Sequence, residues 1–193
     1  MWITSKTSAA AIRKHFQTSA GALHVKIAQP ASGRELVELA RAHAREEYGE
    51  QLAQIICQHP SIAGRYLAAL DRILPRSLGL ANAIATSGKA PVSLLRRYAA
   101  RRDRHLREHA KLALLSRSLD GAGVRKFREV LEKSRGDKPS AVARRSIVLL
   151  HPSTPREVLA DLCLDPVDSF AKEAARRLEA LSRTGTRRRT TQP

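Results

Sequence analysis

Aromatic residues are scarce in this sequence, at 4% of 193 residues. The hydrophobic residues make up 42% of the chain and are mostly Leu, Ala, Ile and Val. These side chains build helices that pack face to face rather than aromatic-rich sandwiches or barrels. The length suits one domain with tails. The composition therefore predicts an all-α fold.

Cysteine is also rare. The two cysteines, Cys57 and Cys163, lie far apart in the apolar stretches QIICQ and ADLCLD. Each suits a small buried hydrophobic position better than half of a disulfide or a metal ligand. A reducing, cytoplasmic location is therefore expected.

Long apolar runs are missing as well, since no segment approaches the roughly 18 consecutive apolar residues of a membrane span. Residues 1–34 contain no acid and are rich in Ser, Thr and Ala, with Lys6, Arg13, Lys14 and Lys26 among them. That composition resembles transit or effector-export segments. We interpret this N-terminal part as a partly helical or flexible segment, with a delivery signal as the alternative.

Motifs for catalysis or metal binding are absent. The sequence has no Walker-type glycine loop, no G-x-S-x-G elbow and no paired-cysteine motif. His105 and His109 are spaced like a zinc pair, but the only nearby further ligand, Glu108, lies off their face. His59 and His151 precede prolines at corresponding places in a repeat, which predicts a role in turns. No enzymatic activity, cofactor, metal or small-molecule substrate is predicted.

Internal repeats are what the sequence has instead. The segment that begins at His151 aligns without gaps with three earlier segments, which are 59–85, 87–114 and 124–150. These alignments place His59 on His151, Pro91 on Pro155 and Val130 on Val158. Four units therefore follow one another, and each is predicted to be a helix, a tight turn and a second helix.

The last unit carries the clearest local signals. Thr154 is predicted to N-cap a helix with Pro155 at its first position and Glu157 completing a capping box. Asp165 before Pro166 is predicted to accept amides at the next helix start. Spacings of three, four and eight residues place one apolar stripe on each helix. The stripe residues are Val158, Leu159, Leu162, Phe170, Ala174 and Leu178.

Further helices are predicted upstream of the repeats. Ser32 and Glu35 form an S-x-x-E signal for a helix that breaks near Gly49. A second helix is expected over about 50–58, and another over 5–16. The predicted domains are an N-terminal segment over 1–30, a helical-repeat domain over 31–183 and a disordered basic tail over 184–193.

The string SIVLLHPSTPREVLADLCLDPVDSFAKEA resembles the leucine-rich repeat variant (LRV) family, with its best match in HPSTPREVLADLCLDP. The resemblance is clearest over residues 147–178 and covers 59–178, where earlier units match mainly at Leu, Ala and Pro. It implies an α-solenoid, a right-handed superhelix of about four HEAT-like helix pairs, here with extra N-terminal helices. It also implies a binding scaffold with no catalytic set. The units begin at positions 59, 87, 123 and 151, an uneven spacing that departs from the family's shorter period, so a generic HEAT-like stack is the alternative.

Positive charge is concentrated in the middle units. The net charge is +17, and residues 88–150 contribute +11 of it, from 17 basic and 6 acidic residues. Such a field attracts polyanions and disfavours a basic partner. The many arginines suit bidentate contacts with phosphate or carboxylate, and the alternative is that a GC-rich genome gives the same bias without functional meaning. The predicted polyanion-binding residues are Arg96, Arg97, Arg101, Arg102, Arg104, Arg107, Lys111, Arg125, Arg128, Arg144 and Arg145.

These residues predict a non-catalytic binding module that engages a polyanionic partner, with nucleic acid favoured. The contact surface is predicted to be a band formed where the second and third repeat units stack. Phosphate contacts would gain affinity by counterion release. Tyr98 and His105 are the only ring side chains near the arginines of residues 96–111, which gives little support to base stacking. Alternatives are a solvated face without specific function, an acidic protein or membrane surface as partner, and an interaction adaptor or secreted bacterial effector that uses the repeat groove.

A helical-repeat DNA glycosylase is disfavoured. Such enzymes usually grip the lesion with aromatic residues near a catalytic carboxylate. The only tryptophan, Trp2, lies outside the repeats, and the central acids Asp103 and Asp120 have no aromatic neighbours.

Overall fold

The computed structural model describes residues 2–3, 7, 9–17, 26–27, 32–136 and 138–189. Their regular structure is helical, apart from the two-residue parallel strands β1 (Trp2–Ile3) and β2 (Lys26–Ile27). The all-α prediction is confirmed. The helices are α1 (Ala9–Gln17), α2 (Gly33–His43), α3 (Gly49–Gln58), α4 (Gly64–Ile73), α5 (Leu78–Thr86), α6 (Val92–Ala99), α7 (Arg104–Ser118), α8 (Val124–Glu132), α9 (Pro139–Leu150), α10 (Arg156–Leu162) and α11 (Asp168–Arg189).

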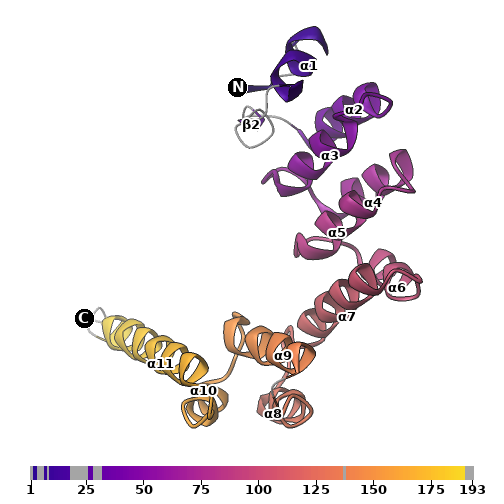
Figure 1. Ribbon diagram of the computed structural model, residues 1–193. Coiled ribbons are helices and arrows are strands. Elements are labelled where there is room, and N and C mark those ends of the chain that lie inside the picture. Colours follow the sequence, from indigo (N-terminus) through magenta and orange to yellow (C-terminus); the bar gives the residue numbers. More distant parts are fainter. Residues whose placement is uncertain are drawn as a thin grey trace. The chain divides into compact units, whose positions relative to one another are not determined.

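The chain divides into two compact units, 1–114 and 115–193, with the boundary inside α7. In unit 1, α2 packs on α3 and α4, and α5 packs on α3, α4 and α6. In unit 2, α8 packs on α9 and α10, and α11 packs on both of those helices. Each unit thus has two layers, one made of the first helices of successive pairs and one made of the second helices. Figure 1 shows α8 and α10 in one layer and α9 and α11 in the other.

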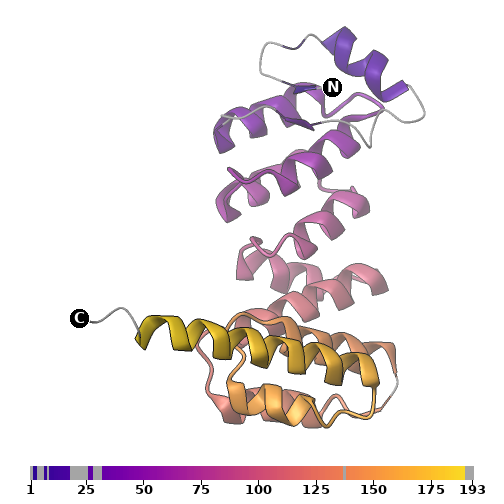
Figure 2. The ribbon, with the colours of Figure 1, turned by 90° about the vertical axis from the view of Figure 1, so that its left-hand side faces the viewer.

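Each unit buries its own apolar core between these layers. Unit 1 uses Leu, Ile and Ala side chains from α2 to α7, with Tyr98 as its largest fully buried side chain. Unit 2 centres on Phe127, and the predicted stripe of its last helix pair is buried up to Ala174, with Leu178 packed at the margin. Figure 2 shows the helices of unit 1 lying across the page, with turns at both ends.

The predicted capping box at the start of α2 is confirmed. The Ser32 hydroxyl accepts a hydrogen bond from the Glu35 amide at 3.2 Å, and the Glu35 carboxylate accepts one from the Ser32 amide at 2.7 Å. These two bonds lower the pKa of Glu35. Gly49 begins α3, so the predicted break between the first two helices of this region is present.

His59 and His151 form the same turn in the two units. Each residue ends a helix, with φ and ψ of −65° and 137° at His59 and of −63° and 133° at His151. Each Nδ1 accepts a hydrogen bond from the amide two residues on, Ser61 or Ser153, at 3.2 Å. The predicted role of both histidines in turns is confirmed.

A cation from a later element closes each of these turns. Lys89 Nζ donates to the His59 carbonyl at 3.0 Å, and Arg177 Nη2 donates to the His151 carbonyl at 3.2 Å. Burial lowers the pKa of His59, and the positive charge of Lys89 lowers it further. The His59 ring is therefore neutral near pH 7, as its acceptor role at Nδ1 requires.

Helix starts correct the predicted alignment of the third unit. Ala63, Pro91 and Pro155 are all N-caps, as the alignment of the first, second and last units requires. The N-cap of α8, however, is Gly123, which the predicted alignment places opposite His151 and not opposite Pro155. The prediction was wrong for this helix because a slip of four residues is close to one helical turn and leaves the apolar stripe almost in place.

The predicted cap of α10 is also wrong. Pro155, not Thr154, is the N-cap, and no side chain caps the helix. The Thr154 hydroxyl is buried and lies 2.6 Å from the Val148 carbonyl oxygen and 2.9 Å from the His151 carbonyl oxygen, which share its one proton, because a buried hydroxyl needs a partner and the end of α9 offers these two. Asp165 does accept an amide at the next helix start, from Val167 at 2.9 Å.

The two chain ends and the two cysteines can be set beside their sequence predictions. The helix predicted over 5–16 corresponds to α1, while Lys6 lies outside the described residues. Helical backbone continues through Arg189, past the predicted start of a disordered tail at 184, and residues 190–193 lie outside the described part. Both thiols are free, and burial raises the pKa of Cys57 to about 12.

Arg145 is a charged residue inside unit 2, only 5% exposed. Its Nη1 lies 3.2 Å from both carboxylate oxygens of Asp165, and its Nη2 donates to the Gly136 carbonyl at 3.0 Å. Its guanidinium carbon also lies 5.0 Å from the centre of the Phe170 ring. One side chain therefore joins α9 to α11 and to two turns.

Replacing Arg145 with Ala is expected to lower the free energy of unfolding by about 3–5 kcal/mol, because a buried carboxylate would lose its cation. Urea denaturation followed by circular dichroism measures this loss. Arg144→Ala is the matched control, since Arg144 is half-buried and forms no ion pair with a described residue; its expected cost is below about 1 kcal/mol. Equal losses in the two variants would show that the Arg145–Asp165 pair contributes nothing special.

Candidate functional site

The predicted polyanion-binding residues belong to both units. Seven of them, from Arg96 to Lys111, lie in unit 1 on α6, the following turn and the first part of α7. The remaining four, from Arg125 to Arg145, lie in unit 2 on α8 and α9. The band that would merge the two groups stays a prediction.

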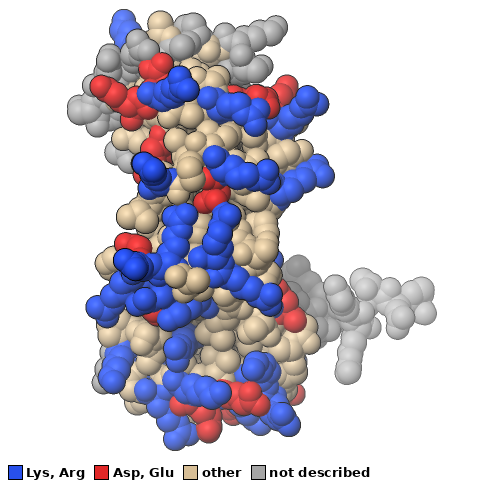
Figure 3. All heavy atoms as spheres, turned by 90° about the vertical axis from the view of Figure 1, so that its right-hand side faces the viewer, with Lys and Arg blue, Asp and Glu red and all other residues tan. Residues whose placement is uncertain are grey.

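The unit 1 group has the higher density of positive charge. Residues 89–111 contain eight basic side chains and two acidic ones, Asp103 and Glu108. Figure 3 shows Lys and Arg side chains crowded together at the height that α6 has in Figure 1. We call the seven basic residues from Arg96 to Lys111 the α6–α7 basic surface.

Three arginines of this surface keep their charge free. Arg96, Arg102 and Arg104 are exposed, and none forms an ion pair or hydrogen bond with any residue that the structure describes. They come from α6, from the α6–α7 turn and from the start of α7. Their guanidinium groups can therefore take an external anion without first breaking an internal contact.

A buried carboxylate holds α6 in place beneath them. Asp71 of α4 is 5% exposed and accepts hydrogen bonds from Arg97 Nη2 and from the Tyr98 hydroxyl. Burial raises the pKa of Tyr98, and the hydrogen bond to Asp71 raises it further, so the hydroxyl stays a donor. The Arg97 side chain remains 55% exposed, which leaves part of its guanidinium facing solvent.

The turn after α6 is attached to α4 in a second way. Arg101 Nη2 donates to the Pro75 carbonyl at 3.2 Å, and its guanidinium carbon lies 5.6 Å from the centre of the Tyr98 ring. Stacking and a backbone hydrogen bond together limit where this arginine can point. The basic turn is thus built on a fixed base.

Glu108 partly neutralises the α7 end of the surface. Its carboxylate lies 3.1 Å from Lys111 Nζ and 3.9 Å from Arg107 Nε. The hydrogen bond from Lys111 lowers the pKa of Glu108, and the positive charges of Lys111, Arg107 and Arg104 lower it further. Lys111 and Arg107 therefore offer less free charge than the arginines of the turn.

The unit 2 group is more occupied by internal contacts. Arg125 is almost fully exposed, but its Nε lies 3.3 Å from Glu129. Arg128 binds Asp161 through Nε at 2.7 Å and Nη2 at 3.3 Å, and this pairing raises the pKa of Arg128. Arg144 is half-buried. Arg145 is enclosed in the fold and has no guanidinium surface to offer a partner.

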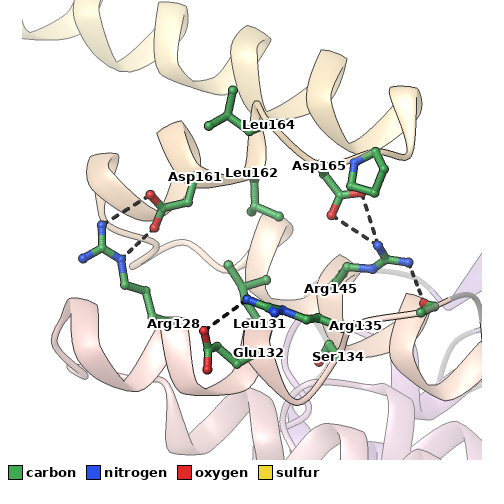
Figure 4. A pocket seen from close by; sticks show the side chains of 12 residues that line it. Arg128, Leu131, Glu132, Ser134, Arg135, Arg145, Asp161, Leu162, Leu164 and Asp165 are labelled. Atoms are coloured by element: carbon green, nitrogen blue, oxygen red, sulfur yellow. Dashed lines mark hydrogen bonds and ion pairs between the residues drawn. The ribbon is translucent and has the colours of Figure 1, made fainter.

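Unit 2 also contains an open pocket of about 590 Å³ between α8, α10 and the following turns. Figure 4 shows Leu131 and Leu162 between ion pairs on either side. Each of its three arginines faces an acid, so the lining has no excess positive charge. The pairs are Arg128–Asp161, Arg145–Asp165 and Arg135–Glu132. The Ser134 hydroxyl donates to the Val130 carbonyl at 2.5 Å, so it has no activating base.

The histidine pair on α7 does not converge on a common site. His109 Nδ1 lies 3.1 Å from the side-chain oxygen of Asn82 on α5, and His105 is exposed. Across the described residues, no group of three or more His, Cys, Asp or Glu side chains could hold a metal ion.

Sequence reasoning missed the contribution of α4. Asp71 follows Leu67 and Leu70 on the apolar face, and an acid on such a stripe signals a buried partner that could have been sought. Sequence reasoning also missed Arg72 and Arg76, because residues 59–87 carry a net charge of only +2. These arginines directly follow Asp71, which α6 binds, and Pro75, which the turn after α6 binds.

Comparison of the chain with models of known families, with curated proteins and with solved structures gives no match. The predicted LRV resemblance and the predicted binding function therefore rest on the residues alone. Within the ranges that the structure describes, no helix is both long and apolar enough to span a bilayer.

Tyr98→Phe is expected to lower the free energy of unfolding by about 1–3 kcal/mol, because the ring still packs but the buried Asp71 carboxylate loses a donor. Thermal or urea unfolding measures the loss. Tyr66→Phe is the control, because the Tyr66 hydroxyl only accepts a hydrogen bond from the exposed Arg65 at 3.0 Å, and its removal should cost under about 1 kcal/mol. A Tyr98 variant as stable as the control would mean that this network does not hold α6.

Proposed function

We propose that this chain is a non-catalytic helical-repeat module that binds nucleic acid through the phosphate backbone, using the α6–α7 basic surface. The observation that carries the proposal is that Arg96 of α6, Arg102 of the following turn and Arg104 at the start of α7 have no ion pair or hydrogen bond with a described residue, while Asp71 and Pro75 hold α6 and its turn in place. Cations held without internal partners are suited to a ligand that brings its own negative charges.

The architecture we propose is an α-solenoid of the LRV or HEAT-like kind. Two layers of helices in each unit support it, because α2 packs on α4 and α3 on α5 in unit 1, and α8 packs on α10 and α9 on α11 in unit 2. The matching His59 and His151 turns support it further, since they show one structural device used at two repeat junctions. Stacked repeats of this kind present extended surfaces to their partners.

The chemistry favours phosphate contacts over base readout. Each arginine that neutralises a phosphate releases condensed counterions, which gives affinity without sequence preference. Among the described side chains, no Phe, Tyr or Trp ring is exposed, so base stacking has little support beyond the imidazole of His105. The expected ligand is therefore bound by charge and by the shape of its backbone.

Fluorescence anisotropy with a labelled 24-base-pair DNA duplex tests the proposal. The wild-type chain should bind at 50 mM salt, and its affinity should fall steeply as salt rises. The triple variant Arg96→Gln, Arg102→Gln, Arg104→Gln should bind more weakly. Its slope of log affinity against log salt concentration should be shallower than that of the wild type by up to about 2.7, because each lost phosphate contact contributes about 0.9 to the slope.

A second triple variant with the same change in charge serves as the control. Lys172→Gln, Arg176→Gln and Arg183→Gln remove cations from α11, where each pairs with an acid of the same helix. This control should keep most of the affinity. Equal weakening by both triple variants, or no binding by the wild type at low salt, would overturn the proposal. Displacement of DNA by polyglutamate at equal charge concentration would instead favour an acidic protein as partner.

A further inference from the structure

Two further arginines, Arg72 of α4 and Arg76 of the turn after α4, adjoin residues that hold the α6–α7 basic surface. Arg72 directly follows Asp71, which binds Arg97, and Arg76 directly follows Pro75, whose carbonyl binds Arg101. Both Arg72 and Arg76 are exposed, and neither has an ion pair or hydrogen bond with a described residue. The two contacts that hold α6 against α4 therefore bring a second set of free cations beside the first.

The turns of unit 1 separate charge between its two edges. Short turns reverse the chain, so the turns within helix pairs lie on one edge and the turns between pairs lie on the other. The turns within pairs after α4 and α6 carry Arg76, Arg101 and Arg102. The turns between pairs, 59–63 and 87–91, carry one cation, Lys89, which is already bound to the His59 and Pro60 carbonyls. Free positive charge thus gathers on the first edge.

The neighbouring helix α2 repeats the pattern of α4 but neutralises it. Counted from the N-caps Ser32 and Ala63, the arginines of the two helices and of the turns after them occupy the same positions, which are Arg34, Arg41 and Arg45 after Ser32 and Arg65, Arg72 and Arg76 after Ala63. Glu38 pairs with Arg41 at 2.6 Å. Glu46 and Glu47 immediately follow Arg45. Exposed acids on α4 are absent, because its one acid, Asp71, is buried. The surface of excess charge therefore covers α6 and α4 and ends at α2.

The arrangement of these cations in two rows fits a duplex better than a single strand. Asp71 binds Arg97 and Tyr98 of α6, and the Pro75 carbonyl binds Arg101, so the arginines that follow Asp71 and Pro75 form a second row beside those of α6 and its turn. Each groove of duplex DNA is bordered by two phosphate backbones, so two neighbouring rows of cations can each contact one backbone. A single strand has one backbone and would leave one row unused. The described part of the surface also offers a single strand no exposed Phe, Tyr or Trp ring on which its bases could stack.

We propose that the ligand of the α6–α7 basic surface is double-stranded nucleic acid and that its second backbone lies along Arg65 and Arg72 of α4 and Arg76 of the turn after α4. The inference rests on the proposed function, because it specifies the ligand of the same surface. It adds three binding residues and the strandedness of the partner.

The test compares two matched triple variants of the full chain by anisotropy, each with a 24-base-pair DNA duplex and with one strand of that duplex. The α4 variant is Arg65→Gln, Arg72→Gln, Arg76→Gln, and the α2 variant is Arg34→Gln, Arg41→Gln, Arg45→Gln. The wild type should bind the duplex more tightly than the single strand. Raising salt from 50 to 200 mM should weaken duplex binding by the α4 variant about 40-fold less than it weakens binding by the wild type. This factor follows from the loss of three phosphate contacts, each of which releases about 0.9 counterions.

The α2 variant should change duplex affinity by no more than about threefold, because its arginines are offset by acids. Circular dichroism checks that both variants keep their helix content. Equal or tighter binding of the single strand by the wild type would overturn the duplex assignment while leaving nucleic-acid binding intact. Equal effects of the α4 and α2 variants would overturn the assignment of the second row. If the wild type bound neither the duplex nor the single strand at 50 mM salt, the proposed function itself would be overturned.

Discussion

Burial of one apolar stripe per helix between two layers organises everything else in this structure. Once Leu67, Leu95 and Leu159 face inward, only the outer faces and the turns remain for most of the 35 basic residues. The turns within pairs and the turns between pairs then fall on different edges. Whether a basic residue contributes to a surface is therefore decided by its place relative to the apolar stripe and to the nearest turn.

Two buried ion pairs show how the same chemistry can have different consequences. Asp71 lies inside unit 1 and pairs with Arg97, whose side chain reaches the surface, so the acid is hidden and part of the cation stays available. In unit 2 both members of the Arg145–Asp165 pair are buried, so the cation is lost to any partner. A buried carboxylate under a half-exposed arginine anchors a basic surface, whereas a buried arginine stabilises only the fold.

Free charge, rather than total charge, distinguishes the two groups of arginines. Residues 88–150 carry +11, but Arg125 and Arg128 form ion pairs with acids, while Arg96, Arg102 and Arg104 form none with a described residue. On α2 and α4 the same spacing of arginines recurs with and without neighbouring acids. Neutralisation by local acids explains why equal numbers of basic residues on neighbouring helices need not contribute equally to attraction of a polyanion.

Sequence patterns were enough to predict the helical class, the capping box at Ser32, the paired turns at His59 and His151 and the most basic stretch. These features depend on residues a few positions apart, whose spacing is visible along the chain. The register of α8 was not predictable in this way, because a slip of four residues keeps the same face inward. Nor did the sequence reveal that Arg145 is buried or that Asp71 and Pro75, which precede Arg72 and Arg76, bind α6 and its turn. Those outcomes depend on side chains that are distant in the chain, as Arg145 is from Asp165 and Arg97 is from Asp71, and only tertiary packing brings such partners together.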